Sequence, residues 1–144
     1  MNYFTRYYTE NQKVDDLTLE VDDDAFKIAI YHPEGSEKNI YPYLKHFENE
    51  NLEVVVSGKY WVDIMNRNIN KGKALEIIQK KLNILPSETM AFGDYMNDIE
   101  MLKNSKFSYA MQNAHPFVKE NATYSALTND DFGVVSIIRD YLKL

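Results

Sequence analysis

The side chains best suited to chemistry follow a short apolar run at residues 89–92. This run predicts a strand that ends in Gly93 and Asp94, and Asn97 and Asp98 follow at the start of a predicted helix. Open α/β sheets bind ligands beyond the carboxyl ends of their strands, which is where these polar groups fall. Asp94 offers the hard oxygens that Mg²⁺ prefers, although one carboxylate is too few for a complete site. Asn97 and Asp98 equally fit an ordinary helix cap.

Two lysines stand at the start of another predicted helix, in the run NKGKAL. Lys71 and Lys73 flank a glycine there. Because the helix dipole favours anions at an N-terminus, neither cation gains stability from the helix itself. An anion such as phosphate would explain both of them, and two ordinary surface lysines are the alternative interpretation.

The second half of the chain alternates between strand and helix patterns. Helices are expected from residue 71 to 82, from 97 to 104, from 116 to 121 and after Gly133. Strands are expected at residues 89–92, 107–111 and 124–127. This alternation predicts an α/β fold with a parallel sheet covered by helices.

The first half has a different order of elements. Strands are expected at residues 26–31 and 52–57, with a further apolar stretch at 60–65. Ile40, Leu44 and Phe47 lie on one face of a helix predicted within residues 37–50. This is an α+β unit, and the polar run at 66–70 marks the boundary. The predicted domains are therefore residues 1–65 and 66–144.

Composition excludes several classes of function. The net charge of -6 disfavours sequence-independent binding to nucleic acids. No apolar run approaches the roughly 18 residues of a membrane span, which predicts a cytoplasmic protein that does not associate with a membrane. The chain has no cysteine, so thiolate metal sites are excluded. His32, His46 and His115 are widely spaced and are interpreted as turn or surface residues.

Four runs, in this order, resemble the C-terminal part of Cof-type haloacid dehalogenase (HAD) phosphatases, which carry a class IIB cap. They are NKGKAL, LPSETMAFGDYMNDIEML, SYAMQNA and VKENATYSALTNDDFGVVSII. Residues 1–65 resemble, more loosely, the closing part of the family's cap. The resemblance implies a HAD-like Rossmannoid half-core with an α+β partial cap lobe.

The resemblance also implies roles for individual residues. Lys71 matches the lysine that contacts the substrate phosphate and the nucleophile, with Lys73 as a less favoured helper. Asp94 matches the aspartate that binds Mg²⁺, and Asn97 matches the asparagine near the phosphate. Asp98 matches the acidic residue that supports the metal site through its waters or neighbours, and it is expected to be catalytic together with Lys71 and metal-binding together with Asp94. Residues 113–114 match a loop near the site and receive no chemical role.

The family's nucleophile and acid/base form a DxD motif on the first core strand, which should precede the cap. We therefore expect the chain to be the C-terminal portion of a phosphatase, inactive alone. In the alternative interpretation Asp22 and Asp24 are the nucleophile pair of a small capless enzyme, with Ser57 as the phosphate-binding hydroxyl. Ala25 and Phe26 count against it, because a strand pattern resumes there at once.

The family's reaction is hydrolysis of small phosphate monoesters, such as sugar or cofactor phosphates, through an aspartyl-phosphate. The expected partners are therefore a small phosphorylated metabolite, and the missing N-terminal half or a second copy of the chain. A non-catalytic interaction module that keeps the fold without the chemistry is the remaining hypothesis.

Overall fold

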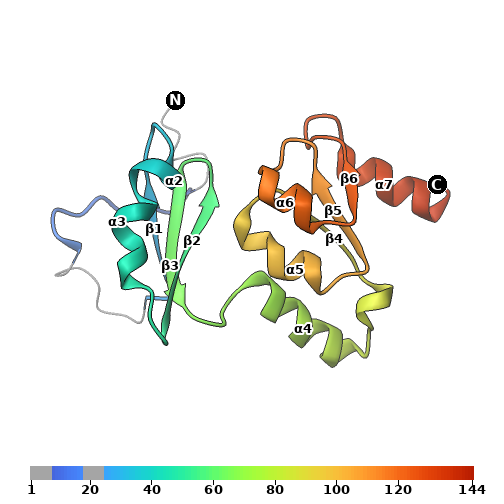
Figure 1. Ribbon diagram of the computed structural model, residues 1–144, viewed down its shortest axis with the longest axis horizontal. Helices are drawn as coiled ribbons and strands as arrows, with labels where there is room; N and C mark the ends of the chain where they lie inside the picture. Colours follow the sequence, from blue (N-terminus) through green and yellow to red (C-terminus); the bar gives the residue numbers. More distant parts are fainter. Residues whose placement is uncertain (1–7, 18–24) are drawn as a thin grey trace.

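A computed structural model describes residues 8–17 and 25–144, and within them the chain forms two lobes (Figure 1). The first lobe contains the antiparallel sheet β1-β3-β2, and the second contains the parallel sheet β4-β5-β6. Residues 67–70 connect the two lobes. No described helix combines the length and the apolar composition of a membrane-crossing segment.

The sheet of the first lobe is covered by helices on one face. Its strands are β1 (Lys27–Tyr31), β2 (Leu52–Gly58) and β3 (Trp61–Asn66), and its helices are α2 (Ser36–Asn39) and α3 (Tyr41–Leu44). Alternate residues of a strand point to opposite faces. The even-numbered face is buried against the helices, and its cluster consists of Val54, Val56 and Val62 with Ile40, Tyr41, Leu44 and Ile64 packed around it.

The single helix predicted within residues 37–50 is wrong. The chain instead forms α2, α3 and a short 3-10 turn at Lys45–Phe47. Pro42 lies at the start of α3, where its ring and its missing N–H prevent a helix from continuing through. Ile40 and Leu44 pack on the lobe's core as expected, but Phe47 is exposed.

The second lobe confirms the predicted α/β fold with a parallel sheet. Its strands are β4 (Met90–Gly93), β5 (Phe107–Met111) and β6 (Tyr124–Ala126). Its helices are α4 (Lys71–Leu82), α5 (Ile99–Lys103), α6 (Pro116–Asn121) and α7 (Gly133–Leu142). The helix predicted at 97–104 begins as a 3-10 turn at Met96–Asp98, because Asp98 turns its carboxylate back toward the preceding loop.

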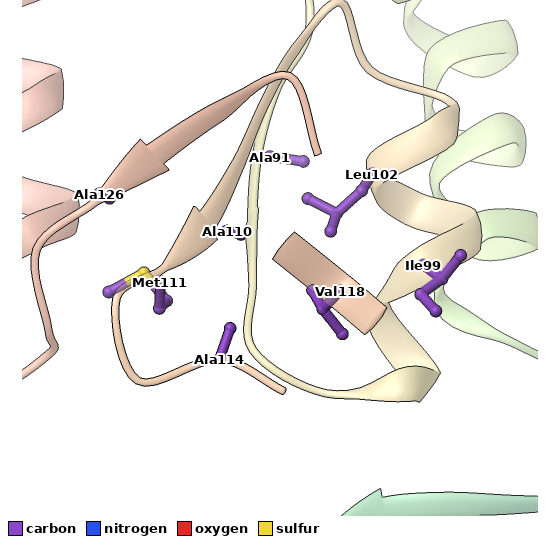
Figure 2. Close-up of a cluster of buried hydrophobic side chains, with 8 residues drawn as sticks. All are labelled: Ala91, Ile99, Leu102, Ala110, Met111, Ala114, Val118 and Ala126. Carbon is purple, nitrogen blue, oxygen red and sulfur yellow. The ribbon is translucent and has the colours of Figure 1, made fainter. Parts of the chain in front are cut away.

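The core of the second lobe lies between the sheet and the helices α5 and α6 (Figure 2). Leu102 and Val118 are its most buried large side chains, with 1% and 0% of their surface exposed. Small side chains of β4, β5 and β6 allow these helices to approach the strands. The full set is Ala91, Ile99, Leu102, Ala110, Met111, Ala114, Val118 and Ala126.

Part of the second lobe's apolar surface is open to solvent. Within the described residues, β4 is an edge strand of its sheet. The helices α4 and α7 expose apolar side chains, namely Ile77, Ile78 and Leu82 on α4 and Val135, Ile138, Tyr141 and Leu142 on α7. Exposed apolar side chains that gather into a patch usually mark an interaction surface.

Candidate functional site

Asp98 is the centre of the candidate site. Its side chain is 4% exposed and forms an ion pair through Oδ1 with the ammonium of Lys71. Its Oδ2 accepts hydrogen bonds from the backbone N–H of Asp94 at 2.9 Å and of Tyr95 at 3.2 Å. Both oxygens of Asp98 are therefore engaged, and the carboxylate fixes the loop after β4 and the lysine beside it.

Two glycines make this arrangement sterically accessible. A Cβ at Gly93 would lie 2.6 Å from the Cβ of Asp98, and a Cβ at Gly72 would lie 2.5 Å from the Cβ of Glu100. Real Cβ atoms do not approach other carbons so closely. Gly72 therefore allows the first turn of α4 to contact α5, and this contact brings Lys71 to Asp98.

Local capping fixes the start of α4. The side chain of Asn70 accepts a hydrogen bond from the backbone N–H of Lys73 at 2.9 Å, which is a standard N-cap. The ammonium of Lys73 pairs with Glu76 at 3.0 Å on the exposed side of the helix. Lys71 and Lys73 thus separate, and of the two only Lys71 reaches the site.

Asp94 presents its side chain beyond the carboxyl end of β4. Its backbone carbonyl accepts a hydrogen bond from the N–H of His115 at 2.9 Å, which ties the loop to the segment after β5. Partial burial raises the pKa of Asp94 above the usual aspartate value, and the nearby charge of Asp98 raises it further, while Lys71 opposes the shift. A carboxylate held this way would be stabilised by a bound cation.

Asp94 and Asn97 face a cleft between the lobes. One part of the cleft, about 740 Å³, lies between these two residues and the first lobe, with Ser57, Trp61 and Asp63 on the far wall. An adjoining part, about 570 Å³, reaches Lys71 on the second lobe and Glu53 on the first. Lys27, Asp63 and Asn97 line both parts. The cleft therefore brings Lys71, Asp94 and Asn97 to one place.

The loop after β4 also joins the lobes mechanically. Tyr95 and Met96 pack against the apolar cluster of the first lobe. His115 faces Glu37 of α2, with 3.6 Å between Nε2 and Oε2. Burial raises the pKa of Tyr95, and the negative charge of Glu37 raises it further. The second lobe thus reaches the first through the same loop that carries Asp94.

Of the other residues that the sequence suggested, Ser57, Asn113 and Ala114 line the cleft. Asp22 and Asp24 lie outside the described residues. Sequence reasoning missed the wall of the first lobe, where Lys27, Glu53 and Asp63 lie. The one available signal was the acidic residue at 63 within the apolar run WVDIM, on the strand face shared with Trp61 and Met65.

The parallel sheet, with its polar site beyond the carboxyl end of β4, defines an α/β protein with a polar cleft between two lobes. The sequence matches the model of the haloacid dehalogenase-like hydrolases over residues 2–138. This protein belongs to that family, as the sequence resemblance predicted.

Relatives and solved structures agree with this assignment. The chain is 37% identical over 95 residues to the 5-amino-6-(5-phospho-D-ribitylamino)uracil phosphatase YcsE of Bacillus subtilis, covering 66% of this chain and 38% of YcsE. It is 31% identical over 137 residues to YbjI of Escherichia coli, described by the same activity, covering 95% of this chain and 50% of YbjI. The structure of SMU.1108c from Streptococcus mutans superposes with a TM-score of 0.75 at 38% identity, covering 83% of this chain and 45% of that one. The chain thus spans half or less of the length of these proteins.

Proposed function

We propose that this chain carries the phosphate-binding and metal-binding side of a Mg²⁺-dependent phosphatase for small phosphate monoesters. The observation that carries the proposal is the network around Asp98, which holds the Lys71 ammonium beside the loop that presents Asp94. Lys71 would bind a phosphate oxygen by charge, and Asn97 would hydrogen-bond to the phosphate. Lys71 would also face the nucleophile, and Asp98 would hold Lys71 in place.

Asp94 is the residue proposed to bind Mg²⁺. Its carboxylate is a hard oxygen ligand that lines the cleft, and its raised pKa fits a side chain placed for a cation. A bound Mg²⁺ would neutralise negative charge on the phosphoryl group. Among residues 8–17 and 25–144, no three His, Asp or Glu side chains gather closely enough to hold a metal. We propose that the remaining protein ligands come from the DxD strand of the family, and that Asp98 supports the metal site by fixing the loop that carries Asp94.

The proposed reaction uses an aspartate nucleophile. Its carboxylate oxygen forms a bond to phosphorus as the bond to the leaving alcohol breaks, and water then hydrolyses the aspartyl-phosphate. We infer that this aspartate belongs to the N-terminal half of a complete enzyme and that the present chain is inactive alone. The alternative assigns the nucleophile to Asp22 and the acid/base to Asp24.

The names of the relatives indicate the first substrate to test. YcsE and YbjI are both described as phosphatases of 5-amino-6-(5-phospho-D-ribitylamino)uracil. This ester joins a phosphate to a polyhydroxylated chain and a nitrogen heterocycle, so it combines features of a sugar phosphate and a cofactor phosphate. We propose esters of this kind as substrates of the complete enzyme.

Hydrolysis of an aryl phosphate with Mg²⁺ tests the proposal. The chain is assayed alone and after mixing with the N-terminal half of a close relative, with Asp22→Asn and Asp94→Asn variants beside it. Activity that appears only in the mixture and disappears with Asp94→Asn supports the proposal. Activity of the chain alone that Asp22→Asn abolishes supports the capless alternative. No activity in the mixture, together with no Mg²⁺ binding that depends on Asp94, refutes the phosphatase.

We further infer that the chain associates through the β4 edge and the apolar faces of α4 and α7. The β4 edge, which has no neighbouring strand among the described residues, can pair with another strand, and the exposed apolar side chains of α4 and α7 favour burial. The partner would be an N-terminal half or a second copy. Light scattering after size exclusion tests this, because a monodisperse monomer that ignores an added N-terminal half would contradict it.

A further inference from the structure

Helix α4 carries Lys71 in its first turn and lies along α5, which starts directly after Asp98 (Figure 1). The ion pair of Lys71 with Asp98 therefore depends on how α4 is placed against α5. A surface helix usually packs through an apolar stripe. The buried residues of α4, however, are Gly72 and Gln79, so the side chain that this helix buries most deeply is a polar one.

The amide of Gln79 uses both of its N–H donors. Its Nε2 atom donates to the hydroxyl of Thr89 at 2.8 Å and to the backbone carbonyl of Asn104 at 2.9 Å. Because a carbonyl can only accept, the contact with Asn104 fixes which way the amide points. Thr89 directly precedes β4, and Asn104 is the last residue of the α5 cap. One side chain thus joins α4 to the start of β4 and to the end of α5.

The side chain of Asn104 returns to the first turn of α4. Its Nδ2 atom donates to the backbone carbonyl of Gly72 at 3.3 Å and contacts Oε1 of Glu76 at 3.4 Å. The Gly72 carbonyl adjoins Lys71 in the chain, whereas Gln79 lies eight positions after Lys71, about 12 Å along the helix axis. Polar contacts therefore hold α4 at both its first and its third turn, which fixes its position and its direction.

Stability alone does not explain a buried amide at this position. Burial removes the hydration of the Gln79 amide, so its hydrogen bonds return little net stability, and an unbranched apolar side chain of similar length would fill the same space. Directional hydrogen bonds differ from apolar contacts in that they are satisfied in one arrangement, and a fully satisfied polar network specifies a unique packing. The network therefore selects one placement of α4.

We propose that Gln79 and Asn104 are positioning residues that hold α4 where the Lys71 ammonium meets Asp98 and a phosphate oxygen. This inference rests on the proposed phosphatase function. Neither residue is among those that line the two parts of the cleft, so both act through Lys71. A displacement of about 1 Å at a binding group can cost on the order of 100-fold. Because half of the Lys71 side chain is exposed, we expect a smaller effect, about tenfold.

Two variants remove the donors and keep the length of the side chains. Gln79→Met removes both bonds of the amide, and Asn104→Leu removes the bond to the Gly72 carbonyl while leaving the backbone acceptor of Gln79 in place. Lys80→Met, at an exposed position of the same helix, is the control. Circular dichroism establishes the temperature range in which each variant is folded, and all measurements are made within that range.

NMR of the lysine ammonium groups reports the position of Lys71, because an ion pair slows the exchange of ammonium protons with water. The Lys71 signal is assigned by its loss in Lys71→Met. We expect it in the wild-type chain and in Lys80→Met, and we expect it to broaden or disappear in Gln79→Met and Asn104→Leu. In calorimetric titrations with inorganic phosphate and Mg²⁺, the same two variants should bind about tenfold more weakly than wild type, equivalent to ~1.4 kcal/mol.

The two measurements separate the positioning of Lys71 from the proposed function. An unchanged Lys71 signal in both variants overturns the inference, and so does a wild-type chain without this signal. Phosphate affinity equal to that of wild type in both variants overturns it as well. If the signal behaves as expected but the wild-type chain binds no phosphate, the positioning of Lys71 stands and the phosphatase function fails. Asn104→Leu decides the matter if Gln79→Met does not fold, because it leaves the buried amide unchanged.

Discussion

Replacing Asp98 with alanine removes the acceptor of two backbone N–H groups and the partner of Lys71. Each hydrogen bond from Asp94 or Tyr95 has a charged acceptor, and such bonds contribute about 1.5–3 kcal/mol. The Lys71 side chain is 51% exposed, so its ammonium regains water and its share is small. In the variant, water partly replaces the lost acceptor of these N–H groups, so the total loss of stability is smaller than the sum of the two contributions. We expect Asp98→Ala to reduce the free energy of unfolding by about 3 kcal/mol.

Asp98→Asn should cost less, about 1–2 kcal/mol, because the amide oxygen still accepts from the loop while the charge is lost. Urea denaturation followed by circular dichroism measures both variants, with the slope of the transition checked for constancy. Glu100→Ala is the control, since its 2.8 Å pair with Lys103 is exposed and should contribute less than about 1 kcal/mol. An Asp98→Ala variant no less stable than Glu100→Ala would refute the structural role of this carboxylate.

Gly72→Ala should destabilise the chain by about 2–4 kcal/mol in the same denaturation assay, because the added Cβ would lie 2.5 Å from the Cβ of Glu100. An unchanged denaturation midpoint would show that α4 does not need to approach α5 this closely. Leu102→Ala should cost about 2–5 kcal/mol, whereas Leu82→Ala, 60% exposed, should cost under about 1 kcal/mol; equal losses would contradict the assigned core. The raised pKa of Asp94 means that the folded state binds more protons than the unfolded state between the two pKa values, so stability should fall as pH rises through that window. Without added metal at neutral pH, Asp94→Asn should therefore be slightly more stable than wild type. The gain should stay below about 1 kcal/mol because the side chain is only partly buried and solvent screens its charge, and a lower melting temperature would contradict this.

The sequence predicted the second lobe well because its signals are local. The helical stripe of α4 and the short apolar strand that ends at Gly93 each lie within a few residues. The error in the first lobe has a different cause, because two local signals conflict there. The periodic spacing of Ile40 and Leu44 predicts one helix, but Pro42 between them divides it into two.

The network at Asp98 and the first-lobe wall depend on contacts between distant segments. Lys71 and Asp98 are 27 positions apart, and only the close contact of α4 with α5 brings them together. Asp63 faces the cleft because the other face of β3 is covered by helices. The family resemblance named Lys71, Asp94 and Asn97 as neighbours, but it did not indicate which side chains of the first lobe oppose them.

The packing of Tyr95 and Met96 on the first lobe has a consequence for dynamics. The lobes cannot separate without moving apolar surface of this loop into water. The same loop holds the backbone amides that Asp98 protects. Separation of the lobes therefore has a hydrophobic cost, whereas the hydrogen bonds of these amides lie within the second lobe, so amide hydrogen exchange at Asp94 and Tyr95 would report the free energy of opening the loop itself.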